Sequence, residues 1–166
     1  MKDDFHIDMS GRIYKGRTIG IAVVGTKTKV NYGCALKRNL IIKVRNELFK
    51  ENIYEDSAKL YAICIYYLIR EVKENINTLI ICNDEDFKVV KNTLKKLLIN
   101  PNFEIINISE FRNRLGRNIG SLADNYARVY RRRALKPTRL SKGKKLNIIQ
   151  VNYKTIKECW EKLDKK

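Results

Sequence analysis

The segment at residues 5–25 constrains the fold most, because it has the pattern of two β-strands joined by a tight turn. Apolar and polar residues alternate over residues 5–10, which is the period of a half-buried strand. Residues 18–24 are more continuously apolar and predict a second strand after a turn at residues 14–16. Asp8 lies in the middle of the first strand, where an acid needs a hydrogen-bond partner, a cation or a metal.

Length and composition predict one globular domain outside the membrane. A chain of 166 residues is long enough for a single hydrophobic core. No stretch approaches the roughly 20 consecutive apolar residues of a membrane span, and the N-terminus lacks the pattern of a signal peptide, so we expect a cytoplasmic location. Four widely spaced cysteines and a single histidine argue against a zinc site of the Cys/His type.

The net charge of +17 indicates a polyanionic partner. A lysine-rich, solvated surface is the alternative explanation for the total charge. However, residues 111–145 hold twelve basic residues and one acid. Because this patch is rich in arginine, whose planar side chain suits phosphate contacts, we expect nucleic acid, either DNA or RNA, as the partner.

The order of the expected elements predicts an α/β domain with a mixed sheet. Two of them carry most of this inference: a helix that is apolar nearly all round, from a cap at Asp56 or Ser57 to residue 75, and a buried strand at 77–83. The other expected elements are a strand at 29–36, a helix at 39–50, a helix at 85–99, a strand at 103–108, a connector at 111–118, a helix at 119–135, a basic linker at 136–145, a strand at 146–151 and a helix at 153–163.

Three acids stand where chemistry could use them. Asp8 lies within the first strand, Asp84 closes the buried strand, and Asp124 is alone among cations in the arginine-rich helix. The carboxyl end of a strand is where open α/β sheets place the groups that bind ligands.

Each of these acids also has a structural alternative. Asp8 could pair with Arg12 or bond the turn backbone, and Asp124 could pair with Arg128 one helical turn later. Asp84 could cap the following helix, and Asp86 is a rival to Asp84 as a ligand.

The three acid-bearing segments, IDMSGR, ICND and SLADNYAR, resemble motifs of the ribonuclease H-like superfamily in type and order. The resemblance implies a mixed five-stranded sheet, three antiparallel strands followed by parallel strands, flanked by helices. It places the ribonuclease H-like domain at residues 1–135. Residues 136–166 would form a basic linker and a strand and helix extension packing on the same domain.

The resemblance also implies a divalent-metal-dependent nuclease of the two-metal-ion type. Asp8 would bridge the two ions and Asp84 and Asp124 would hold one each, with Mg²⁺ or Mn²⁺ suiting an all-oxygen site. This chain departs from the family on the central helix, where a glutamate is usual and Lys59 stands at the aligned position. Glu55 is expected to substitute as a catalytic acid, with Asp56 as the alternative.

Two other functions stay open at this stage. If no acid from the central helix reaches the site, Lys59 would pair with the aspartates and the protein would be a non-catalytic nucleic-acid-binding module. The other is a ribonucleoprotein component in which the aspartates only cap helices. The sequence does not indicate the oligomeric state. The residues expected to bind nucleic acid are Arg12, Arg128, Arg131, Arg132, Arg139 and Lys142.

Overall fold

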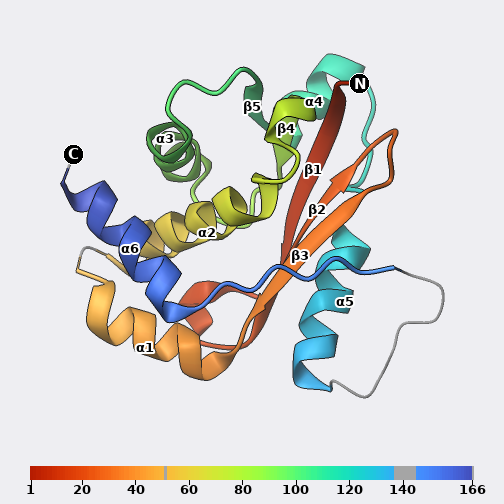
Figure 1. Ribbon diagram of the computed structural model, residues 1–166. Helices are drawn as coiled ribbons and strands as arrows, with labels where there is room; N and C mark the ends of the chain where they lie inside the picture. The colour runs from red at the N-terminus through yellow and green to blue at the C-terminus, as the bar shows by residue number, and fades with distance from the viewer. Residues whose placement is uncertain (51, 137–144, 166) are drawn as a thin grey trace.

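The computed structural model describes residues 1–50, 52–136 and 145–165, which form a five-stranded mixed sheet flanked by helices (Figure 1). The strand order is β3-β2-β1-β4-β5, in which β2 pairs antiparallel with both β1 and β3, whereas β4 pairs parallel with both β1 and β5. The predicted fold class, three antiparallel strands followed by parallel strands, is confirmed. The strands are β1 (Asp3–Ser10), β2 (Ile19–Gly25), β3 (Asn31–Leu36), β4 (Ile76–Ile81) and β5 (Glu104–Asn107).

Helices cover both faces of this sheet. Four helices pack on one face with the main core, while α5 stands alone against the opposite face of β1–β3 (Figure 1). The main-core helices are α1 (Arg38–Leu48), α2 (Ile53–Ile69), α3 (Phe87–Leu98) and α6 (Tyr153–Asp164). The remaining helical elements are α4 (Ile108–Leu115), α5 (Asp124–Leu135) and the short 3₁₀ turns η1 (Ile13–Lys15) and η2 (Lys73–Asn75).

The alternation of β1 divides its side chains between two environments, as the sequence predicted. Phe5, Ile7 and Met9 belong to the main core with α2. His6 lies on the other face, where its ring packs edge-on against Phe111 of α4. Asp8 points to the same side as His6, because successive strand residues alternate.

The central helix α2 begins earlier and ends earlier than predicted. Asn52 is its N-cap and accepts a hydrogen bond from the Glu55 backbone N–H, so neither Asp56 nor Ser57 caps it. Its last helical residue is Ile69, not residue 75. The apolar character predicted for this helix is confirmed, because eleven of its seventeen residues are buried.

Two glycines set how closely α5 approaches the sheet. A Cβ on Gly20 would collide with the Ala127 carbonyl and the Arg131 backbone, and a Cβ on Gly33 would collide with the Tyr130 ring. Only glycine lets a helix backbone approach a strand this closely. The start of α5, with Asp124, is thereby held near the part of the sheet that carries Asp8.

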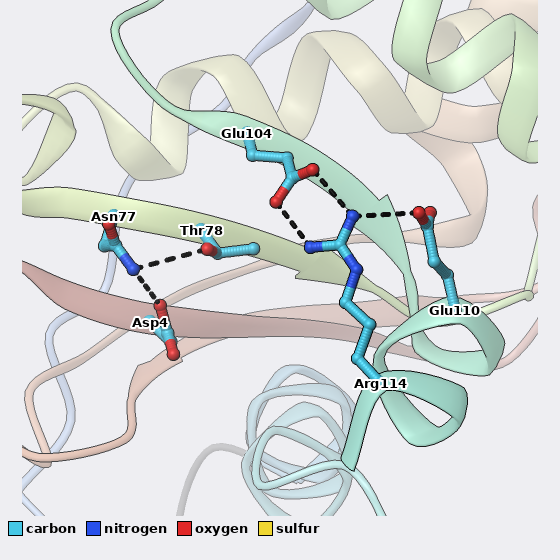
Figure 2. Close-up of polar contacts among 6 residues, drawn as sticks. All are labelled: Asp4, Asn77, Thr78, Glu104, Glu110 and Arg114. Atoms are coloured by element: carbon cyan, nitrogen blue, oxygen red, sulfur yellow. Dashed lines mark hydrogen bonds and ion pairs between the residues drawn. The ribbon is translucent and has the colours of Figure 1, made fainter. Parts of the chain in front are cut away.

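The segment at residues 111–118, predicted to be a connector, is largely helical. α4 begins after Asn107, whose side chain accepts from the Glu110 N–H, and ends at Gly116 in the left-handed conformation with φ 68°. Arg114 fixes this helix to β5 through a paired contact with Glu104 at 2.6 and 2.7 Å and a bond to Glu110 (Figure 2). The cap at Asn107 and the glycine at the C-terminal end stabilise a helix here, although the basic composition of the segment had suggested a connector.

Two further predictions for the C-terminal half were wrong. α5 begins at Asp124 rather than at residue 119, and Leu122, predicted to be buried, is exposed. Residues 146–151 make a single bridge, Gly33 to Ile148, rather than a strand. The terminal helix with Trp160 is confirmed as α6, whereas most of the predicted linker, residues 137–144, lies outside the described residues.

None of the helices in the described part of the chain has both the length and the apolar character needed to cross a membrane.

Asp3 joins the start of β1 to the turn between β2 and β3. Its carboxylate accepts hydrogen bonds from the backbone N–H groups of Asp4, Lys27 and Thr28 and from the Thr28 hydroxyl. Burial opposes ionisation of this group, but the hydrogen bonds outweigh it and lower the pKa of Asp3 below its usual value.

Replacing Asp3 with Asn should destabilise the protein by about 1–3 kcal/mol, because one acceptor oxygen becomes a donor facing other donors. The control Asp4→Asn changes a carboxylate whose printed side-chain contact is with Asn77 at an exposed site (Figure 2) and should cost less than about 0.5 kcal/mol. Since the folded pKa of Asp3 is depressed, its contribution is complete above the unfolded pKa and is lost as pH falls through the folded pKa. Denaturant unfolding from pH 7 to 3 should therefore show the difference in unfolding free energy between the wild type and Asp3→Asn becoming smaller in acid. A difference that stays constant with pH would contradict this.

Candidate functional site

Two acids from neighbouring parallel strands meet at the carboxyl edge of the sheet. The register pairs Ile7 of β1 with Ile81 of β4, and the Cys82 N–H continues the pairing by donating to the Ile7 carbonyl at 3.1 Å. Asp8 and Asp84 follow directly, and ligand atoms of Asp8, Cys82 and Asp84 all lie within 4.8 Å of one another. Asp8 is only 7% exposed.

One backbone group ties the two carboxyls together. The Met9 N–H donates to Asp8 Oδ1 at 2.8 Å and to Asp84 Oδ2 at 3.3 Å. This single donor cannot neutralise two buried negative charges, and the one cation in contact with the pair, Arg12, reaches Asp84 and not Asp8.

The electrostatics of Asp8 reflect this imbalance of charge. Burial raises the pKa of Asp8 to about 8, and the hydrogen bond and charge of Asp84 and the more distant charge of Asp124 add to the effect. Two carboxyls this close do not both ionise readily without a cation. Burial and the neighbouring Asp84 thus both favour the neutral form of the Asp8 carboxyl.

Arg12 pairs with Asp84 and not with Asp8, so the predicted alternative of an Asp8–Arg12 pair is wrong. Its Nη1 lies 3.0 Å from Asp84 Oδ1 and donates also to the Gly11 carbonyl at 3.1 Å. The Arg12 side chain is 37% exposed, whereas that of Asp84 is 12% exposed. The guanidinium thus has one side on the carboxylate and another open to solvent.

Asp86, not Asp84, caps the helix after β4. Its carboxylate accepts from the backbone N–H groups of Lys88 and Val89 at the start of α3. The capping role proposed for Asp84 is therefore wrong, and Asp84 rather than Asp86 is the acid whose carboxylate lies beside that of Asp8.

Asp124 lies near this pair without joining it. It is the first residue of α5, its side chain is 48% exposed, and it forms the expected ion pair with Arg128 at 3.2 Å. Its charge acts on Asp8, but it is outside the group of ligand atoms formed by Asp8, Cys82 and Asp84.

The central helix brings neither Glu55 nor Lys59 to the carboxylates. Glu55 is exposed, and Lys59 faces α6, where it lies 4.0 Å from Asp164 and over the Trp160 ring. Tyr61 occupies the helix face toward the site, about 120° from Glu55 at 100° per residue. The expectation that Glu55 supplies a catalytic acid is not met by this arrangement, and Lys59 does not pair with the aspartates.

Tyr61 is a site residue that the sequence reasoning missed. It is 0% exposed, and its hydroxyl makes no hydrogen bond among the described residues. Burial raises the pKa of Tyr61, and the charges of Asp84 and then Asp8 raise it further. The available signal was that Tyr61, unlike Tyr66 and Tyr67, lies near the start of the apolar stretch, at a position that helical periodicity turns toward the sheet.

Glu85 and Cys82 are two further residues near the pair that the sequence analysis did not single out. Burial raises the pKa of Glu85 to about 7, and its Oε1 is buried with no hydrogen-bond partner in the described structure. Burial raises the pKa of the Cys82 thiol to about 12, with the charge of Asp8 adding to it. Their signal was position, because both lie within two residues of Asp84.

The donor chemistry of this group fits a hard divalent cation. Carboxylate oxygens suit Mg²⁺ and Mn²⁺, whereas a thiol that holds its proton is a poor ligand for either. Asp8 and Asp84 would hold such an ion, which would satisfy the requirement of two buried acids for a cation. The Tyr61 hydroxyl, which the charges of Asp84 and Asp8 also reach, is a further buried polar group whose hydrogen-bonding capacity is unused among the described residues.

The basic residues predicted to bind nucleic acid have different environments. Arg132 is exposed on α5, and Arg128 is exposed but paired with Asp124. Arg131 is partly buried, and its Nε donates to the Thr18 carbonyl at 2.8 Å, which fixes α5 to the sheet. Arg139 and Lys142 lie outside the described residues.

A polar hollow of about 430 Å³ lies near the end of β4. The Asn83 side chain donates to the Ser109 hydroxyl on its rim at 2.9 Å, and the charge of Arg112 acts on Cys82. The lining residues are Ser109, Arg112, Asn113, Gly116, Arg117 and Asn118. The hollow is therefore linked to the segment after β4 through Asn83 and Cys82.

Comparison of the chain with protein-family models, with curated proteins and with solved structures found no match.

Replacing Asp8 with Asn should leave the metal-free protein at least as stable as the wild type at pH 7.5, with a gain of about 1 kcal/mol. The amide oxygen can still accept from Met9, while the amide N–H can donate to Asp84 without a second charge. Thermal unfolding with and without Mn²⁺ measures this. The wild type, but not the variant, should be stabilised by Mn²⁺.

The matched control is Asp124→Asn, which removes an acid outside the pair. It should lose about 0.3–0.5 kcal/mol with its Arg128 contact and gain nothing in metal-free buffer. A large destabilisation by Asp8→Asn would show that the two carboxyls are not in conflict.

Proposed function

We propose that this protein is a divalent-metal-dependent nuclease of the ribonuclease H-like type, which hydrolyses phosphodiester bonds in DNA or RNA. The observation that carries the proposal is the buried pair of Asp8 and Asp84, held together at the carboxyl edge of β1 and β4 beside an arginine-rich helix. The strand order 3-2-1-4-5 agrees with the resemblance of the acid-bearing motifs.

The carboxylate pair supports a role in metal binding. An enzyme gains nothing in stability from two buried acids that repel each other, and such strained groups are typical of functional sites. Bound Mg²⁺ or Mn²⁺ would polarise the phosphate and lower the pKa of a water molecule at neutral pH. Asp8 and Asp84 would hold the ion, with Asp124 near enough to contribute charge.

The reaction needs no oxidant or carrier. The oxygen of a water molecule forms a bond to phosphorus, one bridging P–O bond breaks, and the proton lost by water is balanced by one gained by the leaving oxygen. In this site Arg12 would contact the phosphate, while the Met9 N–H keeps both carboxyls in position.

Charge supports nucleic acid as the substrate. The net charge of +17 is concentrated in the segment that contains α5, and the exposed Arg132 and Arg128 lie on the helix that begins beside Asp8. The hollow lined by Arg112 and Arg117 extends the cationic surface on the side of α4. A phosphate backbone crossing this surface would pass over the carboxylates.

A second function, a non-catalytic nucleic-acid-binding module, is favoured by one observation. Arg12 already places a cation on Asp84 at 3.0 Å, and the central helix presents Tyr61 where a carboxylate would strengthen metal binding. If the arginine alone neutralised the site, the surface would bind phosphate without cutting it.

Cleavage of single-stranded, duplex, hybrid and branched DNA and RNA with Mg²⁺ or Mn²⁺ decides between these functions. Asp8→Asn should reduce cleavage by about 10³-fold or more, because a ligand of the essential ion is lost. The control Asp86→Asn removes a neighbouring charge yet keeps the helix cap, since Asn caps as well as Asp, and should retain activity within about threefold. Binding of these substrates without cleavage by the wild type would favour the module instead.

Replacing Arg132 with Ala should weaken nucleic-acid binding and reduce the slope of log affinity against log salt by about 0.7–0.9, the value for one phosphate contact. The control Lys95→Ala removes an exposed cation from α3, which belongs to the main-core layer, and should leave that slope unchanged. Anisotropy titrations between 50 and 300 mM salt measure both. Equal changes in this slope for Arg132→Ala and Lys95→Ala would mean that the net charge attracts nucleic acid without a defined binding surface.

A further inference from the structure

We propose that the site uses a single divalent ion and that the guanidinium of Arg12 takes the place of a second one at the scissile phosphate. The inference rests on the proposed nuclease function and deepens it, since the two-metal arrangement implied by the family resemblance is replaced. It is carried by the contact of Arg12 with Asp84 and by the small number of carboxylates that converge.

The ligand set has room for one ion. Among residues 1–50, 52–136 and 145–165, only one group of ligand atoms comes together, and its acids are Asp8 and Asp84. Asp124 is outside that group and forms an ion pair with Arg128, while Glu55 is exposed. A pair of closely spaced ions normally requires carboxylates on both sides of a shared one.

The central helix confirms the shortage of acids and marks the place as a ligand site independently. Tyr61 is fully buried, its hydroxyl has no hydrogen-bond partner in the described structure, and the charges of Asp84 and Asp8 act on it. A buried hydroxyl normally has a partner. A neutral hydroxyl can orient a bound water or phosphate oxygen, but it cannot hold a second ion as a carboxylate would.

The balance of charge favours one ion with Arg12. Asp8 and Asp84 are two carboxylates, and Arg12 places one positive charge beside them. One divalent ion leaves this group with a single positive charge, which a phosphodiester would neutralise. A second ion would add two uncompensated positive charges next to the arginine.

Arg12 is oriented for contact with phosphate. Its Nη1 is fixed by two acceptors, Asp84 Oδ1 and the Gly11 carbonyl, and the side chain is more than a third exposed. A guanidinium presents five donors in a plane and stays charged at any pH of interest. The remaining donors can bind the non-bridging oxygens of a phosphate while Asp84 holds the group in place, and Arg12 transfers no proton.

Metal binding tests the proposal without reference to activity. Mn²⁺ is titrated into the purified chain at 150 mM salt, and free Mn²⁺ is followed by electron paramagnetic resonance. The wild type should bind one Mn²⁺ per chain, and Asp8→Asn should bind it at least about tenfold more weakly, since an anionic ligand is lost. Two Mn²⁺ per wild-type chain at this site, both lost in Asp8→Asn, would overturn the proposal.

Arg12 variants separate a cationic role from a structural one. Arg12→Gln should bind Mn²⁺ about three- to tenfold more tightly, because a competing cation next to Asp84 is removed, yet cleave about 10²–10³-fold more slowly. Arg12→Lys should recover much of the lost cleavage. Arg17→Gln, in the same loop and exposed, should leave both quantities within about twofold.

A purely structural role of Arg12 would not make Mn²⁺ binding tighter while making cleavage slower. If Arg12→Gln weakened Mn²⁺ binding and cleavage together, Arg12 would only hold the site in shape and the proposal would be wrong. If the wild type cleaved no substrate, the nuclease function would fail, while the stoichiometry and the tighter binding in Arg12→Gln would still decide whether Arg12 occupies the place of an ion. Thermal unfolding of each variant confirms that it is folded.

Discussion

The repulsion between two buried carboxyls, Asp8 and Asp84, is the constraint on which the rest of the site depends. Strand pairing forces it, because β1 and β4 run parallel in register and both acids follow the last paired residues. One shared N–H, from Met9, and one guanidinium, from Arg12, offset it only in part. The pKa of Asp8 is raised as a consequence. Buried groups with such shifted pKa values are concentrated at functional sites, which is the basis of the proposed cation site.

The surrounding structure serves to keep this pair in place. The apolar helix α2 fills the main core beneath the sheet and presents Tyr61 from below. The glycines of β2 and β3 allow α5 to lie directly on the opposite face, with Asp124 and its arginines beside the acids. α4 is anchored to β5 by the contact of Arg114 with Glu104, and Arg114 also bonds Glu110 within the helix (Figure 2). Acid and base are thus on separate elements that meet at one edge of the sheet.

The sequence predicted the fold better than the site. Alternation in β1 and the apolar strand before Asp84 were strong periodic signals, and the sheet they predicted is observed. The helix starts were harder, because Asn52 and Asn107 decided them through single hydrogen bonds that compete with nearby Asp and Ser residues. The candidate site was predicted only in part. Asp8 and Asp84 meet as expected, but the sequence analysis did not place Tyr61 on the helix face toward them or Glu55 on the exposed face, because both depend on the rotational phase of the helix. The pairing of Arg12 with Asp84 depends on loop geometry. Those follow from packing across the whole chain.

The central claim is that Asp8 and Asp84 together hold one divalent cation. Anomalous diffraction at the manganese edge from a crystal soaked in Mn²⁺ tests it most directly. The account predicts one strong peak within bonding distance, about 2.0–2.3 Å, of an oxygen from each carboxyl, with Arg12 still beside Asp84. The absence of a peak between them at saturating Mn²⁺, with the two carboxyls still in hydrogen-bond contact, would contradict it.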